Sequence, residues 1–336
     1  MAELNALTNS TDKPLHGRHR QVISDDLASV FFFVNYVSLG QAINVFGILT
    51  NMLSIYVFIK MGFRDTVNIS LICLTMSDLF SLLTLFLFNL CQTPEFYNLN
   101  LPFEPYDVAF LTVGWGHVGF SRITCSLTAF ISIERCFCIA LPLKVKSILT
   151  PFRTWIIVLA LFPISYLSIL PIYLTASLTT QFSLYRNRSL LVMTYNNQRG
   201  YMESISSIVN NIIPVSSFII IVVTTLIIVF ELQRKATWRK TSTGNKTVSN
   251  NKDKKVEKMV MFISIIFIIC YLPCEILFLW MLIDPEIRFD GKESNLFKVS
   301  VSILYLAETV NASVNIFVYY FMSSKYKQVL KKMIFK

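Results

Sequence analysis

Apolar residues along this chain gather into long runs that are separated by polar segments. Each run has about 20 or more residues, the length that a helix needs to cross a bilayer. The strands of a membrane barrel would instead show short alternating segments between turns. The pattern therefore predicts an all-α membrane protein, a seven-transmembrane helix bundle over residues 33–321, with helices near 33–60, 67–91, 107–140, 152–175, 202–232, 256–283 and 297–321.

The polar segments outside these runs have their own predicted roles. Residues 1–32 are expected to form an extracellular N-terminal tail, because residues 1–26 mix both charge signs and lack the apolar core of a cleaved signal peptide. Residues 322–336 are expected to form a short cytoplasmic amphipathic helix at the C-terminus. The segment 234–258 is rich in Lys, Thr, Ser and Asn, which is typical of a solvated loop.

Composition and charge support a membrane protein with a fixed orientation. Of 336 residues, 54% are hydrophobic and only 15% are charged, whereas a soluble domain has about 25% charged residues. Most of the 30 Lys and Arg residues fall in every second connection and in the C-terminal segment. Since cytoplasmic loops are enriched in these residues, the N-terminus is predicted to lie outside the plasma membrane. The net charge of +10 then marks an inner face beside membrane lipid, with no nucleic acid as partner.

Sequence motifs argue against an enzyme. The stretch Gly114–Gly119 matches the GxGxxG dinucleotide fingerprint, but that fingerprint requires a strand before it and a helix after it. Here it lies inside an apolar run, where the glycines are expected to allow close helix packing. Three His residues without paired Cys or His spacing predict no metal enzyme. Two glycosylation sequons, at Asn9 and Asn187, fall in predicted outer segments.

A carboxylate, Asp78, lies midway along the second run, where it must find partners or stay protonated. Candidate partners at similar depth in other runs are Asn51, Thr124, Asn311 and Asn315. These residues are predicted to form a polar cage for water or a hydrated cation. The alternative is an interhelical hydrogen-bond cluster that holds no ion.

Charged residues also lie near the predicted outer ends of the helices. Glu275 follows Pro273, a residue that should kink its helix. Together with His117 and Glu308, this carboxylate predicts an outward-opening pocket for a polar or cationic ligand. Arg122 is expected to join the same ligand-binding group, paired either with Glu275 or with an acidic group of the ligand.

At the opposite end of the third run, Glu134 and Arg135 form a charged pair at the membrane edge, where keeping charge is costly and therefore indicates function. Around this pair, over about residues 30–330, the chain resembles the rhodopsin-like (class A) G-protein-coupled receptors. Each of the seven predicted helices carries markers of that family, in order: Asn51; Leu74 and Asp78; Glu134-Arg135-Cys136 with Pro142-Leu143; Trp155; Pro214; Phe267 and Cys270-Tyr271-Leu272-Pro273; and Asn315-Ile316-Phe317-Val318-Tyr319.

The resemblance implies a receptor that binds an extracellular chemical cue or short peptide and activates a heterotrimeric G-protein. It implies that Arg135 is held at rest by Glu134 and by Asp253, and that it is released when the sixth helix swings outward. It also implies that the cage around Asp78 is a sodium site. The switch residues carried over in this way are Glu134, Arg135, Asp253, Tyr271, Pro273, Asn315 and Tyr319.

Several positions depart from the family pattern. Phe110 stands where the family has a cysteine, and the outer segment 175–199 contains no Cys, so the usual disulfide is absent. Cys136, Ile316 and Val222 replace the family's usual Tyr, Pro and Tyr. Signalling competence therefore has to be shown for this chain.

Within the class, the run Ile133–Pro151 resembles a group of molluscan receptors described as chemosensory, which are also distantly similar to neuropeptide receptors. A neuropeptide receptor proper is one alternative. A seven-helix transporter or channel is another, although it leaves Glu134, Arg135 and Asp253 without a role. The sequence names neither the ligand nor the G-protein subtype.

Overall fold

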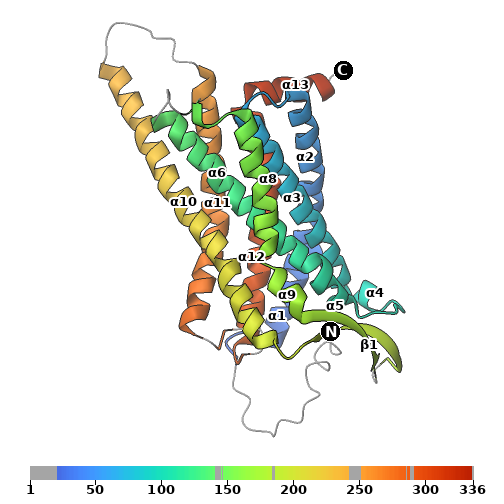
Figure 1. Cartoon of the computed structure of the whole chain (residues 1–336). Helices are drawn as coiled ribbons and strands as arrows, with labels where there is room; N and C mark the ends of the chain where they lie inside the picture. The colour runs from blue at the N-terminus through green and yellow to red at the C-terminus, as the bar shows by residue number, and fades with distance from the viewer. Residues whose placement is uncertain are drawn as a thin grey trace.

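The computed structural model describes residues 21–140, 145, 147–183, 186–241, 251–284, 286–287 and 291–334, which form a bundle of long helices (Figure 1). Seven helical segments in this part of the chain are long and apolar enough to cross a membrane. They are Asp25–Met61, Thr66–Cys91, Pro105–Ala140, Pro151–Thr175, Ile208–Arg234, Lys255–Met281 and Ser294–Met322. The predicted seven-helix membrane bundle is thus confirmed.

The elements follow one another along the chain as α-helices, two π-helical turns (η) and one pair of strands. In order they are α1 (Asp25–Phe32), η1 (Phe33–Ser38), α2 (Leu39–Met61), α3 (Thr66–Cys91), α4 (Pro94–Tyr97), α5 (Pro105–Ala109), η2 (Phe110–Gly114), α6 (Trp115–Ala140), α8 (Pro151–Leu167), α9 (Leu170–Thr175), β1 (Ala176–Ser183), β2 (Arg188–Tyr195), α10 (Arg199–Thr241), α11 (Asn251–Ile283), α12 (Ser294–Met322) and α13 (Ser324–Ile334).

The first helix begins at Asp25, earlier than the predicted boundary at residue 33. Ser24 Oγ accepts a hydrogen bond from the Leu27 N–H at 3.3 Å, which caps the helix. The start of α12 also holds this segment, because Asn295 Nδ2 donates to Asp25 Oδ1 at 2.7 Å and the Val22 N–H donates to Glu293. The described residues of the predicted tail therefore form the capped start of a helix that is anchored to the start of α12.

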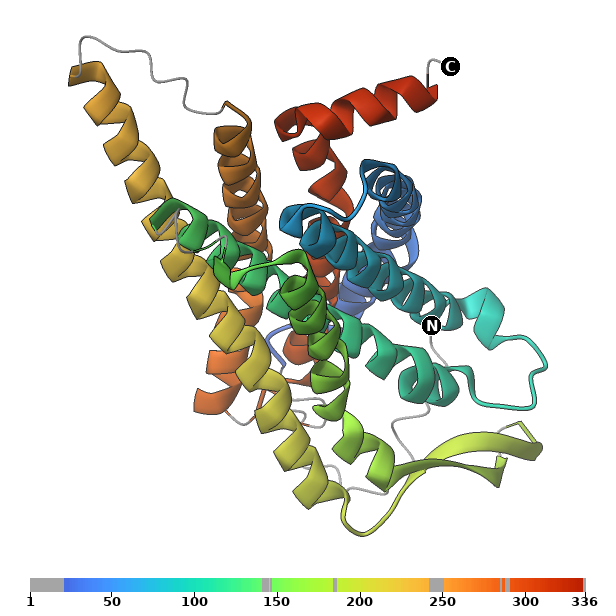
Figure 2. The same cartoon turned by 45° about the horizontal axis from the view of Figure 1, so that its top comes forward.

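The predicted solvated loop at 234–258 is shorter in the structure. α10 continues to Thr241 and α11 already begins at Asn251. The residues after 230 include Glu, Leu, Gln, Arg, Lys and Ala, which favour helix, so α10 extends past its apolar part and projects beyond the neighbouring helices (Figures 1 and 2).

Two glycines permit close approaches that a side chain would block. At Gly40, after the π-helical turn η1, a Cβ atom would lie 1.7 Å from the carbonyl oxygen of Asn35. At Gly119, a Cβ atom would lie 3.0 Å from the ring of Tyr166 in α8. The packing role expected for the GxGxxG stretch is confirmed at this last glycine.

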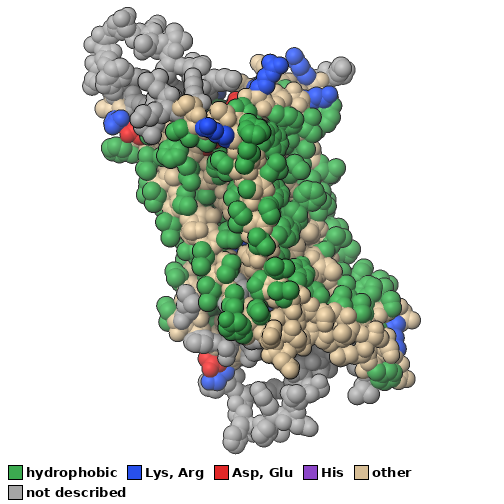
Figure 3. Space-filling view, in the orientation of Figure 1, with side chains coloured by type: hydrophobic (Ala, Val, Ile, Leu, Met, Phe, Trp, Pro, Cys, Tyr) green, Lys and Arg blue, Asp and Glu red, His purple; other side chains and the backbone are tan. Residues whose placement is uncertain are grey.

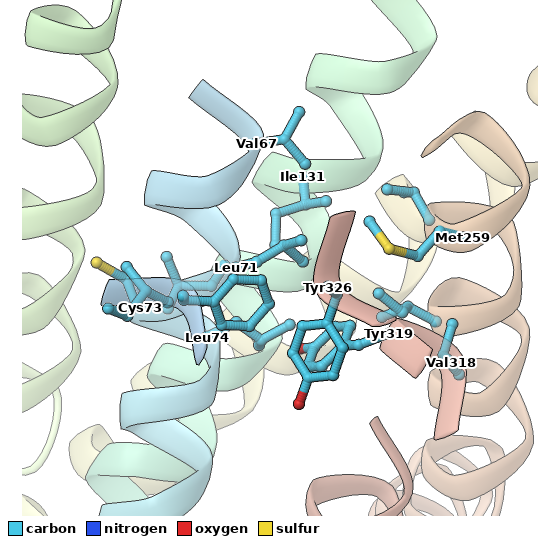
Figure 4. Packing of buried hydrophobic residues seen from close by; sticks show 14 of the residues in the cluster. Val67, Leu71, Cys73, Leu74, Ile131, Met259, Val318, Tyr319 and Tyr326 are labelled. Carbon is cyan, nitrogen blue, oxygen red and sulfur yellow. The ribbon is translucent and has the colours of Figure 1, made fainter. Parts of the chain in front are cut away.

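Aromatic residues join α12, α13 and α2 at one end of the bundle, called here the α13 end (Figure 4). The ring of Tyr319 lies edge-on to Phe58 at 5.1 Å and 5.6 Å from the ring of Tyr326. The Tyr326 hydroxyl lies 2.8 Å from Ser54 Oγ. Burial raises the pKa of Tyr326, so its hydroxyl keeps its proton. These contacts hold α13 across the end of the bundle (Figure 2).

The opposite end, called here the hairpin end, carries the β1–β2 hairpin, an exception to the all-α prediction. Ala176 pairs with Tyr195 and Ser183 with Arg188 in antiparallel register. The segment before α6 holds this hairpin, since the Leu191 N–H donates to the Pro102 carbonyl at 3.0 Å. The hairpin thus extends a small sheet in place of the missing disulfide.

Asp107 completes this attachment, because its Oδ2 accepts the Met193 N–H at 2.9 Å. All seven cysteines are free thiols. Hydrogen bonds therefore connect the hairpin to the start of the third membrane helix, where the family uses a covalent bond.

The surface agrees with a membrane-spanning bundle. Hydrophobic side chains cover the middle of the face shown in Figure 3, whereas the Lys and Arg side chains of that face lie toward the two ends. Such a band is the expected lipid-facing surface.

We expect Asp107→Ala to loosen β2, because the substitution leaves the Met193 N–H without its acceptor. Amide hydrogen exchange over 188–195 should accelerate by about five- to tenfold, equivalent to about 1 kcal/mol of local stability. Glu95→Ala, at an exposed acid of the same end, serves as the control. Unchanged exchange in Asp107→Ala would contradict the anchoring role.

Candidate functional site

At the α13 end, Glu134 and Arg135 form a buried ion pair, with Arg135 Nη2 2.6 Å from Glu134 Oε1. The same carboxylate accepts hydrogen bonds from the hydroxyls of Thr66 and, at 3.4 Å, Ser70. Glu134 is 1% exposed and Arg135 is 8% exposed. Charge cancellation within the pair and extra donors from α3 together make its burial tolerable.

The predicted second partner of Arg135 is not settled by these contacts. Asp253 belongs to α11, but its side chain lies outside the described part of the chain, so the proposed contact stays a prediction. The Arg135 Nε atom is buried and makes no hydrogen bond to the described residues. The described geometry therefore shows α6 tied to α3 at this end. Pro142 and Leu143 of the family motif also lie outside the described residues.

In the middle of the bundle, Asp78 is fully buried and accepts two hydrogen bonds. Thr124 Oγ1 donates to one carboxylate oxygen and Asn315 Nδ2 to the other, each at 2.9 Å. Ser77 Oγ lies 2.9 Å from Thr124 Oγ1. Three helices, α3, α6 and α12, thus meet at one carboxylate.

Of the four predicted partners of Asp78, only Thr124 and Asn315 form hydrogen bonds with its carboxylate. Asn51 donates instead to the backbone carbonyls of Gly47 and Ala312, both at 2.8 Å. Its amide therefore ties α2 to α12 and does not contact Asp78. Asn311 is buried but makes no side-chain hydrogen bond to Asp78.

Tyr271 lies above this cluster, next to the proline of α11. Its ring stacks on Phe267 at 4.1 Å, and its hydroxyl lies 3.2 Å from Ser121 Oγ of α6. Pro273 falls inside α11, where it removes a backbone donor. Tyr271 thereby connects α11 to α6 close to the kink that is expected at Pro273.

Toward the hairpin end, His117 and Glu308 pair with each other. His117 Nε2 lies 3.1 Å from Glu308 Oε2, and Nδ1 lies 3.0 Å from Ser81 Oγ. The imidazole also makes an edge contact with the ring of Tyr305 at 5.2 Å. Since the carboxylate accepts, Nε2 is a donor, and both predicted ligand groups already have a partner within the bundle.

Arg122 and Glu275 differ from that pair, because the ion pair between them, one of the two predicted pairings of Arg122, is absent. Arg122 and Glu275 are each 7% exposed. No nitrogen of the guanidinium lies within 4.0 Å of an oxygen of the Glu275 carboxylate. Arg122 Nε and Glu275 Oε1 are buried without a hydrogen-bond partner in the described structure. Their charges nonetheless lie close enough to interact.

A cavity of about 440 Å³ lies at the α13 end between α3, α11, α12 and α13. Two lysines stand at its edge: Lys255 Nζ donates to Ser324 Oγ and Lys325 Nζ to the Met61 carbonyl, both at 2.8 Å. The apolar part of its lining includes Phe58, Val67, Leu71, Val256, Met259 and Tyr319. The Lys255 contact links α11 to the junction of α12 and α13.

Comparison with known proteins identifies the family. The sequence model of the serpentine type 7TM GPCR chemoreceptor Srw family matches residues 38–336. The chain belongs to this family. It is therefore a G-protein-coupled receptor of the chemoreceptor type and a multi-pass membrane protein, as its resemblance to class A receptors predicted.

More distant similarity extends to curated receptors. The growth hormone secretagogue receptor type 1 of Sus scrofa is 25% identical over 304 residues, covering 87% of this chain and 78% of that receptor. Lysophosphatidic acid receptor 4 is 23% identical over 295 residues in both Mus musculus and Homo sapiens, covering 84% of this chain and 73% of each receptor. These similar proteins are receptors and not enzymes.

Sequence reasoning missed the hydroxyl residues of the site. Thr66, Ser70, Ser77, Ser81 and Ser121 each contact a residue that was predicted. Ser and Thr are common in membrane helices, where they also bond to their own backbone. No spacing rule distinguishes those that face a partner helix.

We expect Glu308→Ala to lower thermal stability more than Glu275→Ala. Removing Glu308 breaks the buried contact with His117, a loss of about 3 kcal/mol, whereas the Glu275 carboxylate has no direct partner to lose. Thermal unfolding of the purified receptor without added ligand measures both. Equal losses in the two variants would show that the His117 contact does not stabilise the bundle.

Proposed function

We propose that this receptor lies in the plasma membrane with its N-terminal segment outside, binds an extracellular chemical cue or short peptide, and activates a heterotrimeric G-protein. The observation that carries the proposal is the buried Glu134–Arg135 pair at the α13 end. A partner that binds this end has to draw Arg135 away from Glu134. The pair is thus a latch whose opening exposes an arginine to the G-protein.

The positive charge supports the orientation. Lys60, Arg64 and Lys255 lie at the α13 end, and α13 itself carries Lys325, Lys327, Lys331 and Lys332. Lys and Arg favour the cytoplasmic side. The hairpin end, with the polar cluster around His117, then faces outward. Of the two predicted sequons, Asn187 lies exposed in the hairpin turn on that side, and Asn9 lies outside the described residues.

The closed contacts at the α13 end support a resting state in this proposal. The hydrogen bond from Lys255 to Ser324 holds α11 inward. G-protein binding therefore requires α11 to move outward, a population shift that ligand binding at the other end biases.

The names of the similar receptors do not determine the ligand. One is named for a growth hormone secretagogue and the other for lysophosphatidic acid. These two classes of ligand differ chemically, and the shared identity with each receptor is low. The class of ligand therefore has to be inferred from the polar cluster around His117 in this chain.

A sodium ion at Asp78 is part of the proposal. Sodium prefers oxygen ligands, as other hard cations do, and the carboxylate of Asp78 lies beside the hydroxyls of Ser77 and Thr124. These residues fit such an ion. Bound there, the ion would supply a positive charge that compensates the buried carboxylate and favours the resting arrangement of α3, α6 and α12.

We expect Arg135→Ala to abolish receptor-stimulated nucleotide exchange on the G-protein. Stimuli come from a screen of amino acids, amines and short peptides on the purified receptor. Lys331→Ala, which removes an exposed charge from α13, should retain exchange within about twofold. Full exchange by Arg135→Ala would refute the role assigned to the latch.

Sodium should stabilise the receptor against thermal unfolding relative to choline at equal ionic strength. At about five times its dissociation constant, the ion adds about 1 kcal/mol. Asp78→Asn should lose this difference, and Asp26→Asn, at an exposed acid, should keep it. The same sodium effect in Asp78→Asn and in the unmodified receptor would exclude an ion at this carboxylate.

A further inference from the structure

The polar cluster around His117, toward the hairpin end, contains two charged side chains with buried atoms that lack a hydrogen-bond partner. Arg122 of α6 and Glu275 of α11 are buried, yet Arg122 Nε and Glu275 Oε1 have no hydrogen-bond partner among the described residues. A buried charge without hydrogen bonds is costly in a low-dielectric interior. Some other group must compensate for that cost when the receptor is occupied.

The surroundings of Arg122 do not supply that group. Its neighbours in the electrostatic environment are Cys125, Cys274 and Tyr271, together with Glu308. The Oε2 atom of Glu308 is engaged by His117 at 3.1 Å, and the Tyr271 hydroxyl is engaged by Ser121. The guanidinium therefore lies among thiols, an aromatic ring and the carboxylates of Glu308 and Glu275, and among the described residues it forms an ion pair with neither.

The charge balance of the cluster restricts the ligand. Glu308 already accepts a hydrogen bond from His117, which leaves Arg122 without an acceptor and Glu275 without a donor at their buried atoms. A purely cationic ligand would leave the Arg122 guanidinium without a hydrogen-bond acceptor, and a purely anionic ligand would leave the Glu275 carboxylate without a donor. A ligand with an amine and an acid group on one small molecule satisfies both.

We infer that the receptor recognises a small zwitterion, with its acid group on Arg122 and its amine on Glu275. This inference rests on the proposed function and specifies its ligand class. His117 and Glu308 then position the site without binding the ligand's charges. Free amino acids are the simplest members of the class.

The test compares each free L-amino acid with its methyl ester, which keeps only the amine charge, and with its N-acetyl derivative, which keeps only the acid charge. Binding is measured as the ligand-dependent rise in melting temperature of the purified receptor. Because a hydrogen bond to a charged group contributes about 1.5–3 kcal/mol, each cap should weaken binding by about ten- to a hundredfold. Equal binding of a capped derivative, or no binding of any free amino acid, overturns the inference.

Two variants assign each contact. Glu275→Gln should bind an amino acid and its N-acetyl derivative equally, whereas Arg122→Gln should bind the amino acid and its methyl ester equally. Glu95→Gln and Arg64→Gln, at exposed positions, should keep the discrimination of the unmodified receptor. If instead both site variants melt at lower temperature and keep that discrimination, the two charges are structural and the inference fails.

The melting measurement needs no G-protein, so it separates this inference from the proposed function. Nucleotide exchange by the same preparations tests the function. Zwitterion binding without exchange counts against G-protein activation and leaves the ligand class standing. Exchange that capped derivatives stimulate as well as free amino acids leaves the receptor function standing and excludes the zwitterion.

Discussion

Hydrocarbon around the helices offers no water and no counter-ions, so each charge inside the bundle needs a partner from within it. This constraint accounts for the arrangement at both ends of α6. At one end Glu134 accepts hydrogen bonds from Arg135 and from the hydroxyls of α3. At the other end His117 and Glu308 join α6 to α12. The packing of the helices around α6 follows from these pairs as much as from apolar contacts.

The exceptions to this rule indicate where the molecule acts. Arg122 and Glu275 lack the hydrogen-bond partners that the other buried charges have, and they lie on α6 and α11. In the proposed function, a ligand that bridges them changes the balance between two positions of α11. At the α13 end the same helix is held by the contact between Lys255 and Ser324. The proposal thus places ligand contact and G-protein contact at the two ends of α11, which is what reciprocal coupling between sites requires.

The hairpin end shows how hydrogen bonds can substitute for a covalent constraint. With every cysteine a free thiol, β2 pairs with the segment before α6, and Asp107 accepts the Met193 N–H. The N-terminal segment is held in a similar way by Glu293 and Asn295 at the start of α12. These contacts are weaker than a disulfide, so the hairpin is expected to open locally at a lower cost in free energy.

The sequence alone determined the seven membrane helices and the depth of Asp78, because bilayer thickness and hydrocarbon polarity act directly on the order of residues. The receptor family was predicted from the resemblance of the motifs on those helices. The extension of α10 to Thr241 was not predicted, because the polar residues after 233 were interpreted as a solvated loop although they include helix-forming residues. The sequence did not determine which buried side chains pair with each other. His117 and Glu308 are 191 residues apart, and whether they meet each other or Arg122 depends on how α6, α11 and α12 are rotated and spaced. Helical periodicity fixes which residues share a face of one helix, but only tertiary packing decides which faces meet, and that packing leaves Arg122 and Glu275 without the ion pair that was one of the two predicted pairings.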